Sequence, residues 1–552
     1  MSNLYFRYKK AAKPVFDGFA LEVRDGERLA VLGPSEAGKS TLALCLNGLI
    51  PRLIKGDYRG QLEVANLPLQ YCRPRHLAGQ VAALFQDFEA QLFCTRVDQE
   101  VAFGPENLGL PLEVLKRRVA RALSLVGLSG WGRRNPATLS GGQKQLLALA
   151  AVLALEPRLL VLDEPTTDLD PLRVEELLFT LDRLSLKENF TLMLLGEDLR
   201  LAWHCSRIVL LERGQVAVDG PPGPVLRQVE TFRRLGLRPL GLPALFHDLG
   251  QTELPLNLAE AEDQARRLGW KARRRESEAD SPATAGTAGP EILALREVTF
   301  SYPGEAAIFQ DLSLSFRKGE ITAILGPNGS GKTTLVKLLR GLLKPQGGEV
   351  WTAPATRVGF VFQNPDYQLF AEQVWEEVAF GPRSLGLDQR EVQARVETAL
   401  SRVHLLARAE EDPFSLTKGQ RQRLAVAAVL ALSPQVIILD EPTTGLDHRE
   451  QADLLDLVRE LHAQGHTIIM VTHSMWAAAT YARRLIVLHA GKVALDGPTR
   501  EVLGQEGVLG ECSLRPPAVV QLSRRLGFMA LTVDEFRAKV IKWGERTGEI
   551  RD

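Results

Sequence analysis

Short apolar runs alternate with amphipathic stretches along the whole chain. The runs are ERLAVLG, RLLVLDEP and TLMLLG in the first half, and ITAILG, QVIILDEP and TIIMVTH in the second. Their apolar residues are continuous and do not alternate with polar ones, which is typical of parallel strands covered on both faces. The pattern therefore predicts an α/β fold whose main sheets are mixed but mainly parallel.

Two further stretches keep the apolar spacing of an amphipathic helix. They hold Leu115, Val119, Ala122, Leu123 and Val126 in the first half, and Val392, Val396, Ala399, Leu400 and Val403 in the second. Both lie between the first and second strand-like run of their half. Each half is therefore predicted to be an α/β core with a helical insertion.

The chain is an internal duplication. Phe85-Gln86 recurs as Phe362-Gln363, and Asp163-Glu164-Pro165 recurs as Asp440-Glu441-Pro442 at the same separation. The tails LRP…LG, 237–250 and 514–527, keep this register too. Before Gln86 the first half carries extra residues, which we place around 50–64, near Gly56–Gly60.

Composition marks a break between the halves. Residues 273–290, RRRESEADSPATAGTAGP, are first charged and then small and rich in Pro and Gly. This is typical of a flexible linker, with an interaction tract as the alternative. We expect a first domain with its C-terminal extension at 1–270, a linker at 271–290, and a second domain with its own extension at 291–552.

Charge and cysteine content limit the possible functions. Lysine plus arginine equals aspartate plus glutamate, 67 each, so no nucleic-acid partner is expected. The five cysteines are scattered without a CxxC pair, as in a reduced cytosolic protein. The start of the chain has no apolar core of a signal peptide. The most apolar stretch, 146–155, is shorter than the roughly 20 residues that span a bilayer. Any membrane role is therefore expected to work through partner chains.

Two segments fit the phosphate-binding pattern GxxxxGK[ST], each between an apolar run and a predicted helix. Glycines let backbone amides curl around a phosphate, the lysine reaches the β- and γ-phosphates, and the hydroxyl binds Mg²⁺. The predicted nucleotide-binding residues are Gly33, Pro34, Ser35, Glu36, Ala37, Gly38, Lys39, Ser40 and Thr41, and Gly326, Pro327, Asn328, Gly329, Ser330, Gly331, Lys332, Thr333 and Thr334.

Paired acids end two of the apolar runs. Asp163 and Asp440 would lie at the carboxyl edge of the sheet, where an acid can hold Mg²⁺ together with Ser40 or Thr333. Glu164 and Glu441 would continue the strand and point the other way, to polarise an attacking water. Structural acids at strand ends are the alternative.

These motifs, followed by LSGGQ at 139–143 and LTKGQ at 416–420, resemble the ATP-binding-cassette family over both halves. The resemblance implies ATP and Mg²⁺ as ligands, sandwiched head to tail between two cassettes. It implies adenine stacking by Tyr8 and Tyr302, and Mg²⁺ sensing by Gln86 and Gln363. Loops 168–170 and 445–447 would cross the interface. The implied signature residues are Ser140, Gly141, Gly142 and Gln143, and Thr417, Lys418, Gly419 and Gln420. For Ser140, which would begin a helix suited to an anion, an ordinary helix cap is the alternative.

The resemblance makes the two sites unequal. Site one would combine the first half's Lys39 and Glu164 with LTKGQ, and site two would combine Lys332 and Glu441 with LSGGQ. His473 resembles the family's switch histidine, whereas the first half offers Glu197 or Gly196, depending on the alignment. We hypothesise that site two hydrolyses ATP while site one mainly holds it. The alternative is that Lys418 is tolerated.

The strings QLF, V, EVAFGP and LGL recur at identical spacing within 86–110 and 363–387. This resembles the ATPases of prokaryotic energy-coupling-factor importers, which take up vitamins or Co/Ni ions. The family implies a transmembrane coupling protein, whose helix the QLF…VAFGP region receives. It also implies a small substrate-binding membrane protein, and C-terminal extensions that help to hold the cassettes together at the cytoplasmic face of the membrane. A core role for Phe103 and Phe380 is the alternative reading of that region. Alternative functions are a ribosome-binding twin-cassette factor, a sugar-importer ATPase and a non-catalytic scaffold.

Overall fold

The computed structural model describes residues 1–541, except 65, 70, 73–76, 140, 167–170, 188–189, 273–288 and 305. Most of the predicted linker, the signature residue Ser140 and the predicted interface loop 168–170 lie outside the described residues. The chain divides into two compact units, Met1–Pro243 and Ala244–Asp552.

The first unit is built on a six-stranded sheet in the order β11-β10-β3-β9-β8-β7. All neighbours run parallel except the edge pair β10 and β11. The strands are β3 (Arg28–Leu32), β7 (Val81–Leu84), β8 (Leu159–Asp163), β9 (Thr191–Gly196), β10 (Arg207–Glu212) and β11 (Gln215–Gly220). The three apolar runs of this half coincide with β3, β8 and β9, so the α/β prediction is confirmed.

A smaller antiparallel sheet, β2-β1-β4, packs the buried rings of Phe6, Phe16 and Phe19 into the same core. Its strands are β1 (Ser2–Tyr8), β2 (Phe16–Phe19) and β4 (Gly56–Gln61), and a hairpin of β5 (Glu63–Val64) and β6 (Leu67–Pro68) follows. The prediction of extra residues near Gly56–Gly60 is wrong. That segment is β4, the counterpart of a strand in the second half, and most of the added length follows it.

The helices of the first unit include the predicted insertion. They are α1 (Lys39–Leu46), α3 (Val97–Asn107), α4 (Leu112–Leu125), α5 (Gly141–Leu153), α6 (Pro171–Lys187), α7 (Pro222–Leu226) and α8 (Val229–Arg234), and α9 (Gly241–Asp248) spans the boundary between the units. Helices α3, α4 and α5 pack on one another and bury Val119, Ala122 and Leu123. The helical insertion is therefore confirmed in this half.

The second unit repeats this plan, with sheets β17-β18-β19-β15-β20-β21 and β14-β13-β16. The strands are β13 (Glu291–Phe300), β14 (Phe309–Arg317), β15 (Ile321–Leu325), β16 (Gly347–Thr352), β17 (Val358–Val361), β18 (Val436–Asp440), β19 (Thr467–Val471), β20 (Arg484–His489) and β21 (Lys492–Pro498). The helices are α11 (Lys332–Arg340), α12 (Val374–Ser384), α13 (Gln389–Arg402), α14 (Lys418–Leu430), α15 (His448–Ala463), α16 (Met475–Tyr481), α17 (Thr499–Leu503), α18 (Glu506–Glu511), α19 (Ala518–Arg525) and α20 (Val533–Lys539).

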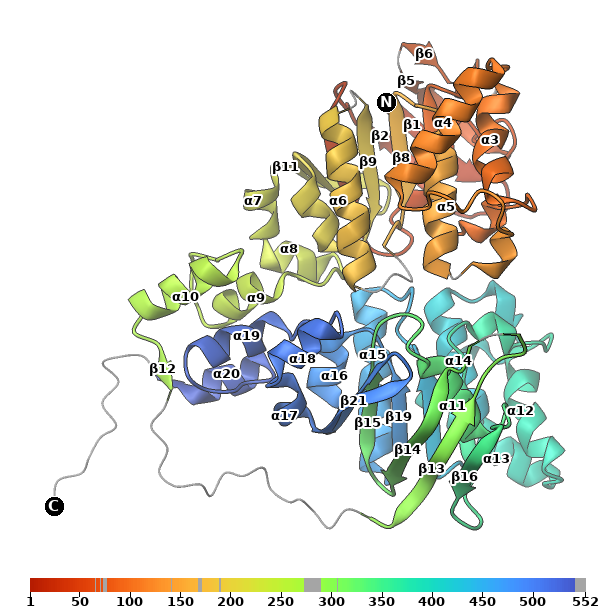
Figure 1. Ribbon diagram of the computed structural model, residues 1–552, viewed down its shortest axis with the longest axis vertical. Coiled ribbons are helices and arrows are strands. Elements are labelled where there is room, and N and C mark those ends of the chain that lie inside the picture. The colour runs from red at the N-terminus through yellow and green to blue at the C-terminus, as the bar shows by residue number, and fades with distance from the viewer. Residues whose placement is uncertain are drawn as a thin grey trace. The chain divides into compact units, whose positions relative to one another are not determined.

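The second unit also contains the end of the first half's tail. Helix α10 (Leu258–Arg267) packs against α19, and β12 (Lys271–Ala272) pairs antiparallel with β22 (Val540–Ile541). Figure 1 shows these elements side by side. Trp270 lies between the rings of Phe246 and Phe536, with centroids 4.9 and 5.8 Å away. The two tails therefore share one small aromatic core.

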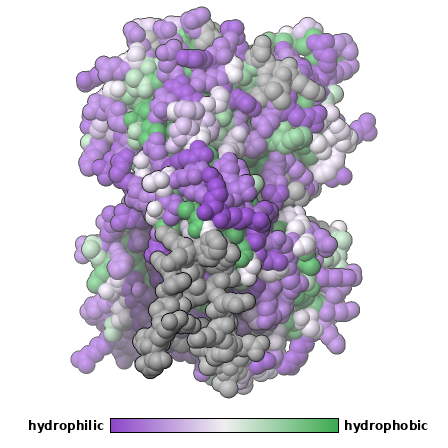
Figure 2. All heavy atoms as spheres, turned by 90° about the vertical axis from the view of Figure 1, so that its left-hand side faces the viewer, coloured by the Kyte–Doolittle hydropathy of each residue, from purple (hydrophilic) through white to green (hydrophobic). Residues whose placement is uncertain are grey.

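No helix among the described residues is both long and apolar enough to cross a membrane. On the face drawn in Figure 2, hydrophilic residues dominate and hydrophobic ones form small scattered patches.

Candidate functional site

Each half places its P-loop between a central strand and a helix. In the first half the loop joins β3 to α1, and in the second it joins β15 to α11. The last glycines, Gly38 and Gly331, have φ of 103° and 100°, and a Cβ there would press against Phe16 or Phe309. Glycine is therefore required where the loop turns into the helix.

The P-loop lysines fold back over the loops that precede them. Lys39 Nζ donates to the carbonyl oxygens of Gly33 and Pro34, at 2.7 and 3.0 Å. Lys332 Nζ donates to Gly326 and Pro327, both at 2.9 Å. Both lysines are buried. Their hydrogen bonds to the loop carbonyl groups hold the two ammonium groups at the loop, where a phosphate would lie.

The predicted magnesium ligands meet at the carboxyl edge of each sheet. Asp163 and Asp440 are the last residues of β8 and β18, and both are buried. Thr333 Oγ1 lies 3.4 Å from Asp440 Oδ1, and the nearby Ser40 hydroxyl acts to lower the pKa of Asp163. Asp163 Oδ1 is buried and has no hydrogen-bond partner. A hydroxyl beside a carboxylate with a spare lone pair fits Mg²⁺, which prefers oxygen ligands.

Burial also shapes the protonation of these acids. It raises the pKa of Asp163, although Ser40 and Lys39 act in the opposite direction. It raises the pKa of Asp440 to about 6, with a further contribution from the nearby Glu441 carboxylate. A nearby cation would favour the ionised form of each acid.

Glu164 and Glu441 do not continue their strands, so the expectation that strand alternation orients them is wrong. Each follows the last strand residue with a left-handed φ, 52° and 47°. Their N–H groups still donate across the sheet, to Leu195 O and Val471 O, both at 2.9 Å. A turn at the strand end therefore sets their direction, and such strained backbone often occurs at functional sites.

Glu441 lies among three polar partners. His473 Nε2 lies 2.7 Å from its Oε1, and Thr444 Oγ1 and Gln363 Nε2 donate to its Oε2 at 3.2 and 3.5 Å. Burial acts to raise the pKa of Glu441, but the hydrogen bond and charge of His473 outweigh it, so the pKa is lowered. Glu441 is thus an ionised carboxylate, as a general base must be.

Glu164 has different surroundings. Its Oε1 lies 3.6 Å from Lys39 Nζ, which also lies 3.3 Å from Glu197 Oε1. Burial, together with the neighbouring Glu197 and Asp163 carboxylates, raises the pKa of Glu164 to about 7 against the opposing effect of Lys39. The pKa of the glutamate at this position is therefore raised in the first half and lowered in the second.

Strand registers settle which residue of the first half corresponds to His473. Leu195 pairs with Asp163 in β8, and Val471 pairs with Asp440 in β18. Two residues beyond these equivalent positions are Glu197 and His473. The alignment with Glu197 is therefore the correct one, and the alignment with Gly196 is wrong.

The two signature loops also differ. Thr417 caps α14 in a capping box with Gln420: its hydroxyl accepts from the Gln420 N–H, and the Gln420 side chain accepts from the Thr417 N–H. Lys418 reaches over Gly445, where a Cβ would collide with its side chain. At Gly141, in the first half, a Cβ would meet open space. Lys418 therefore lies over the glycine of the neighbouring loop in its own half, a contact that the sequence prediction missed.

The predicted adenine-stacking tyrosines lie beside the P-loop helices. Tyr8 Oη is 3.1 Å from Thr41 Oγ1, and Tyr302 Oη is 3.4 Å from Thr334 Oγ1. Both rings are half-buried, and stacking on adenine stays a prediction. Gln86 is the second residue after the end of β7, as Gln363 is after the end of β17.

Two buried carboxylates were missed by the sequence prediction. Glu100 Oε2 accepts from the N–H groups of Phe93 and Cys94, at 3.0 and 2.7 Å. Glu377 Oε2 accepts from those of Phe370 and Ala371, both at 2.8 Å. The available signal was a glutamate at the same place in both halves within an otherwise apolar helical face.

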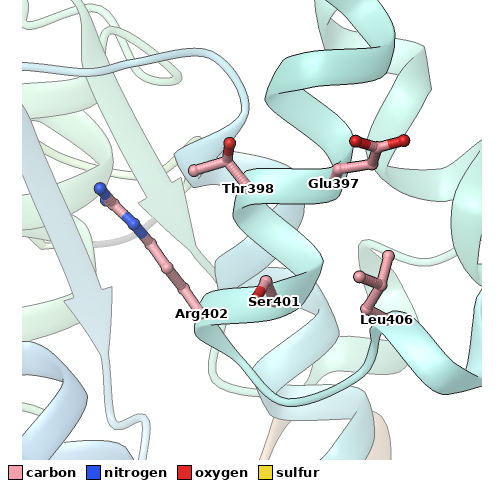
Figure 3. Close-up of a pocket in the computed structure, with 5 residues that line it drawn as sticks. All are labelled: Glu397, Thr398, Ser401, Arg402 and Leu406. Atoms are coloured by element: carbon pink, nitrogen blue, oxygen red, sulfur yellow. The ribbon is translucent and has the colours of Figure 1, made fainter.

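A surface hollow of about 440 Å³ lies away from these residues. Figure 3 shows its lining on α13 and the segment after it: Glu397, Thr398, Ser401, Arg402 and Leu406. It shares no residue with the P-loops, strand-end acids or signature loops. The hollow is therefore separate from the predicted nucleotide-binding residues.

Comparison with known proteins gives the family. The model described as ABC transporter matches residues 16–167 and 309–444. A protein of Caldanaerobacter subterraneus subsp. tengcongensis named "Putative ABC transporter ATP-binding protein" is 42% identical over 97% of this chain and 97% of its own length. "Putative HMP/thiamine import ATP-binding protein YkoD" of Bacillus subtilis is 33% identical over 94% of this chain and 95% of its own.

Among solved structures, cbiO1 from Clostridium perfringens is 33% identical, with a TM-score of 0.38, over 42% of this chain and 99% of its own. The family match covers both P-loops and both strand-end acid pairs. The chain therefore belongs to the ABC transporter family and carries two of its ATPase cassettes in tandem.

Proposed function

We propose that this chain is the ATP-hydrolysing subunit of an energy-coupling-factor importer for a micronutrient, a vitamin or a transition-metal ion. It would act at the cytoplasmic face of a prokaryotic membrane. Its partners would be a transmembrane coupling protein and a small substrate-binding membrane protein. The observation that carries the proposal is a pair of exposed phenylalanines, repeated in both cassettes.

The aromatic pairs come from the QLF and VAFGP segments. Phe93 and Phe103 are 61% and 46% exposed, with ring centroids 4.6 Å apart and edge to face. Phe370 and Phe380 are 61% and 54% exposed, with the same geometry at 4.8 Å. A core role for Phe103 and Phe380 is therefore wrong. Exposed aromatic pairs are costly in water and mark protein interfaces.

The loops that carry these rings are held in place. The buried carboxylates of Glu100 and Glu377 each accept two backbone N–H groups from the loop. Charge-assisted hydrogen bonds inside a protein are strong, and breaking them would leave a buried charge unpaired. The ring pairs are thus presented in a fixed arrangement, which favours docking of a preformed partner helix.

A second set of hydrogen bonds joins each aromatic loop to the nucleotide site. Gln91 accepts from the Phe85 N–H at 2.9 Å and donates to Ala83 O at 3.2 Å. Gln368 accepts from the Phe362 N–H at 3.4 Å. The next residues along the chain, Gln86 and Gln363, are the predicted Mg²⁺ sensors. Movement of that segment on ATP binding would therefore move the aromatic loop.

In the active state we propose that each ATP binds between one cassette's P-loop and the other's signature loop. Glu441 would polarise the attacking water, with His473 and Gln363 orienting its carboxylate. Mg²⁺ would be held by Ser40 and Asp163 or by Thr333 and Asp440, and would neutralise phosphate charge. Site two, with Glu441, would hydrolyse ATP, and site one, with Glu164, would mainly hold it. The relative named for HMP/thiamine import supports an importer.

The test is affinity purification of the tagged chain from detergent-solubilised host membranes, with mass spectrometry of what accompanies it. We expect two polytopic membrane proteins, one of them small. Replacing all four ring residues by Ala should lower their recovery about tenfold, as loss of interface anchors does. Phe179→Ala, an equally exposed phenylalanine outside the pairs, is the matched control.

Other outcomes would overturn the proposal. Ribosomal proteins in place of membrane proteins would favour a soluble twin-cassette factor. Large membrane subunits without a small one would favour another class of ABC importer, such as one for sugars. Equal recovery with and without the four rings would remove the aromatic pairs from the interface.

A further inference from the structure

Glu197 inserts a carboxylate among the phosphate-binding groups of the first cassette. Its Oε1 accepts a hydrogen bond from Ser35 Oγ at 3.2 Å and lies 3.3 Å from Lys39 Nζ. Ser35 and Lys39 both belong to the P-loop. The side chain of Lys39 is only 7% exposed, so this ion pair is poorly screened by solvent.

The donors that hold Glu197 are those that a terminal phosphate would use. Lysine and hydroxyl groups bind carboxylate and phosphate oxygens through the same charge-assisted hydrogen bonds. In P-loop ATPases the lysine reaches the β- and γ-phosphates. The Glu197 carboxylate therefore binds the donors that a phosphate group beyond the β-phosphate would use.

The charge balance around Lys39 strengthens this point. A second carboxylate, Glu164, lies 3.6 Å from Lys39 Nζ, so one cation faces two acids. At the equivalent position of the second cassette, His473 presents an imidazole nitrogen 2.7 Å from Glu441. A protonated imidazole nitrogen can donate to a phosphate oxygen, whereas a carboxylate can only repel it.

We infer that Glu197 is a specificity-determining residue that makes the first cassette's P-loop prefer a nucleoside diphosphate to a triphosphate. ADP ends at the β-phosphate and leaves the Glu197 pair with Ser35 and Lys39 intact. ATP must displace the carboxylate or place its γ-phosphate against it. Site one, proposed above to hold ATP, would on this inference retain ADP instead while site two turns over ATP.

This inference deepens the proposed inequality of the sites and rests on it only for its role in turnover. The nucleotide preference itself follows from contacts inside one cassette. It can therefore hold even if the membrane partners differ from those proposed, and it can fail while the importer proposal stands.

The test is isothermal titration calorimetry on the full chain carrying Lys332→Ala, so that the first cassette supplies the nucleotide site. The probes are ADP and the non-hydrolysable triphosphate AMP-PNP, each with Mg²⁺. We expect ADP to bind at least about tenfold more tightly, because a γ-phosphate meets a poorly screened like charge. Adding Glu197→Gln should bring the two affinities within about threefold, mainly by tightening AMP-PNP, because the amide carries no charge.

The matched control transfers the residue to the other cassette. In a chain carrying Lys39→Ala, adding His473→Glu should weaken AMP-PNP binding by about tenfold relative to ADP. The same titrations with both P-loops intact keep the test valid if either lysine variant is unstable. In that chain, Glu197→Gln should tighten the weaker AMP-PNP site.

An unchanged ratio of ADP to AMP-PNP affinity on Glu197→Gln would overturn the inference. So would an equal loss of affinity for both nucleotides, because that result would mark Glu197 as a structural support of the P-loop and not as a determinant of specificity.

Discussion

The two predicted catalytic carboxylates, Glu164 and Glu441, lie on equivalent turns after equivalent strands, yet one neighbour sets them apart. In the second cassette His473 lowers the pKa of Glu441 although burial acts to raise it. In the first cassette burial and Glu197, which stands at the position of His473, together raise the pKa of Glu164 to about 7. The two glutamates share their backbone geometry, whereas their pKa values shift in opposite directions.

This difference shows how a duplicated site can diverge while its fold is kept. The P-loop lysines make the same two contacts with the loop carbonyl groups in both cassettes. Glu164 and Glu441 share a left-handed φ. A single exchange of imidazole for carboxylate is enough to change the charge that a terminal phosphate would meet.

The largest effect is expected from exchanging the diverged residues. His473→Glu should lower the ATPase rate of the assembled complex by about a hundredfold, because it removes the group that orients the general base and adds a like charge. Glu197→His should raise the rate by less than about threefold, because site two already limits turnover. Steady-state phosphate release measures both. A similar loss in the two variants would mean that the sites are equivalent.

The buried glutamates that hold the aromatic loops are shared by the two cassettes, so their substitution should have equal effects in both. Glu100→Ala and Glu377→Ala each leave two partly buried backbone N–H groups without that acceptor, so each should lower the free energy of unfolding by about 2 kcal/mol. Each should also reduce recovery of the membrane partners. Chemical denaturation and affinity purification measure these effects.

The matched control for this pair is the adjacent, exposed Glu376, whose Ala variant should stay within about 0.5 kcal/mol of wild type. If Glu376→Ala is as damaging as Glu377→Ala, the buried carboxylate has no special role in holding the aromatic loop.

The smallest effect is expected from pH in Mg²⁺-free buffer. Because the pKa of Glu164 rises to about 7 on folding, the folded protein keeps a proton that the unfolded chain releases near its ordinary pKa. Stability should therefore fall as pH rises from 6 to 8, by about 1 kcal/mol from this residue, or roughly 3 °C in Tm.

Calorimetry of wild type and Glu164→Gln with EDTA isolates that contribution. The variant should show a smaller fall in Tm between pH 6 and pH 8. Parallel pH profiles of the two proteins would mean that the pKa of Glu164 is not raised in the folded state.

Much of the fold follows from sequence because parallel strands and P-loops have strong local signals. The apolar runs coincide with β3, β8, β9, β15, β18 and β19, and the strand-end positions of Asp163 and Asp440 follow from them. The spacing of apolar residues predicted α4 and α13, because an amphipathic helix also has a strong local signal. The site motifs therefore came from continuous stretches of sequence.

The sequence predictions failed where tertiary contacts determine the conformation, exposure or alignment of a residue. The turn at Glu164 and Glu441 is fixed by hydrogen bonds to the next strand, so strand alternation does not apply. The exposure of Phe103 and Phe380 depends on which elements pack against their helices, and helical spacing alone does not give this. The match of Glu197 to His473 depends on strand register, because a one-residue difference in the preceding segment shifts the gapless alignment.

The most direct test of unequal sites compares Glu441→Gln with Glu164→Gln in the assembled complex, measured by steady-state ATPase. The account predicts a loss of about a hundredfold or more for Glu441→Gln, because it removes the general base of site two. It predicts a loss of less than about threefold for Glu164→Gln, because Glu164 is paired with Lys39 and has Glu197 in place of a histidine of the kind that orients Glu441. Equal losses in the two variants would contradict it.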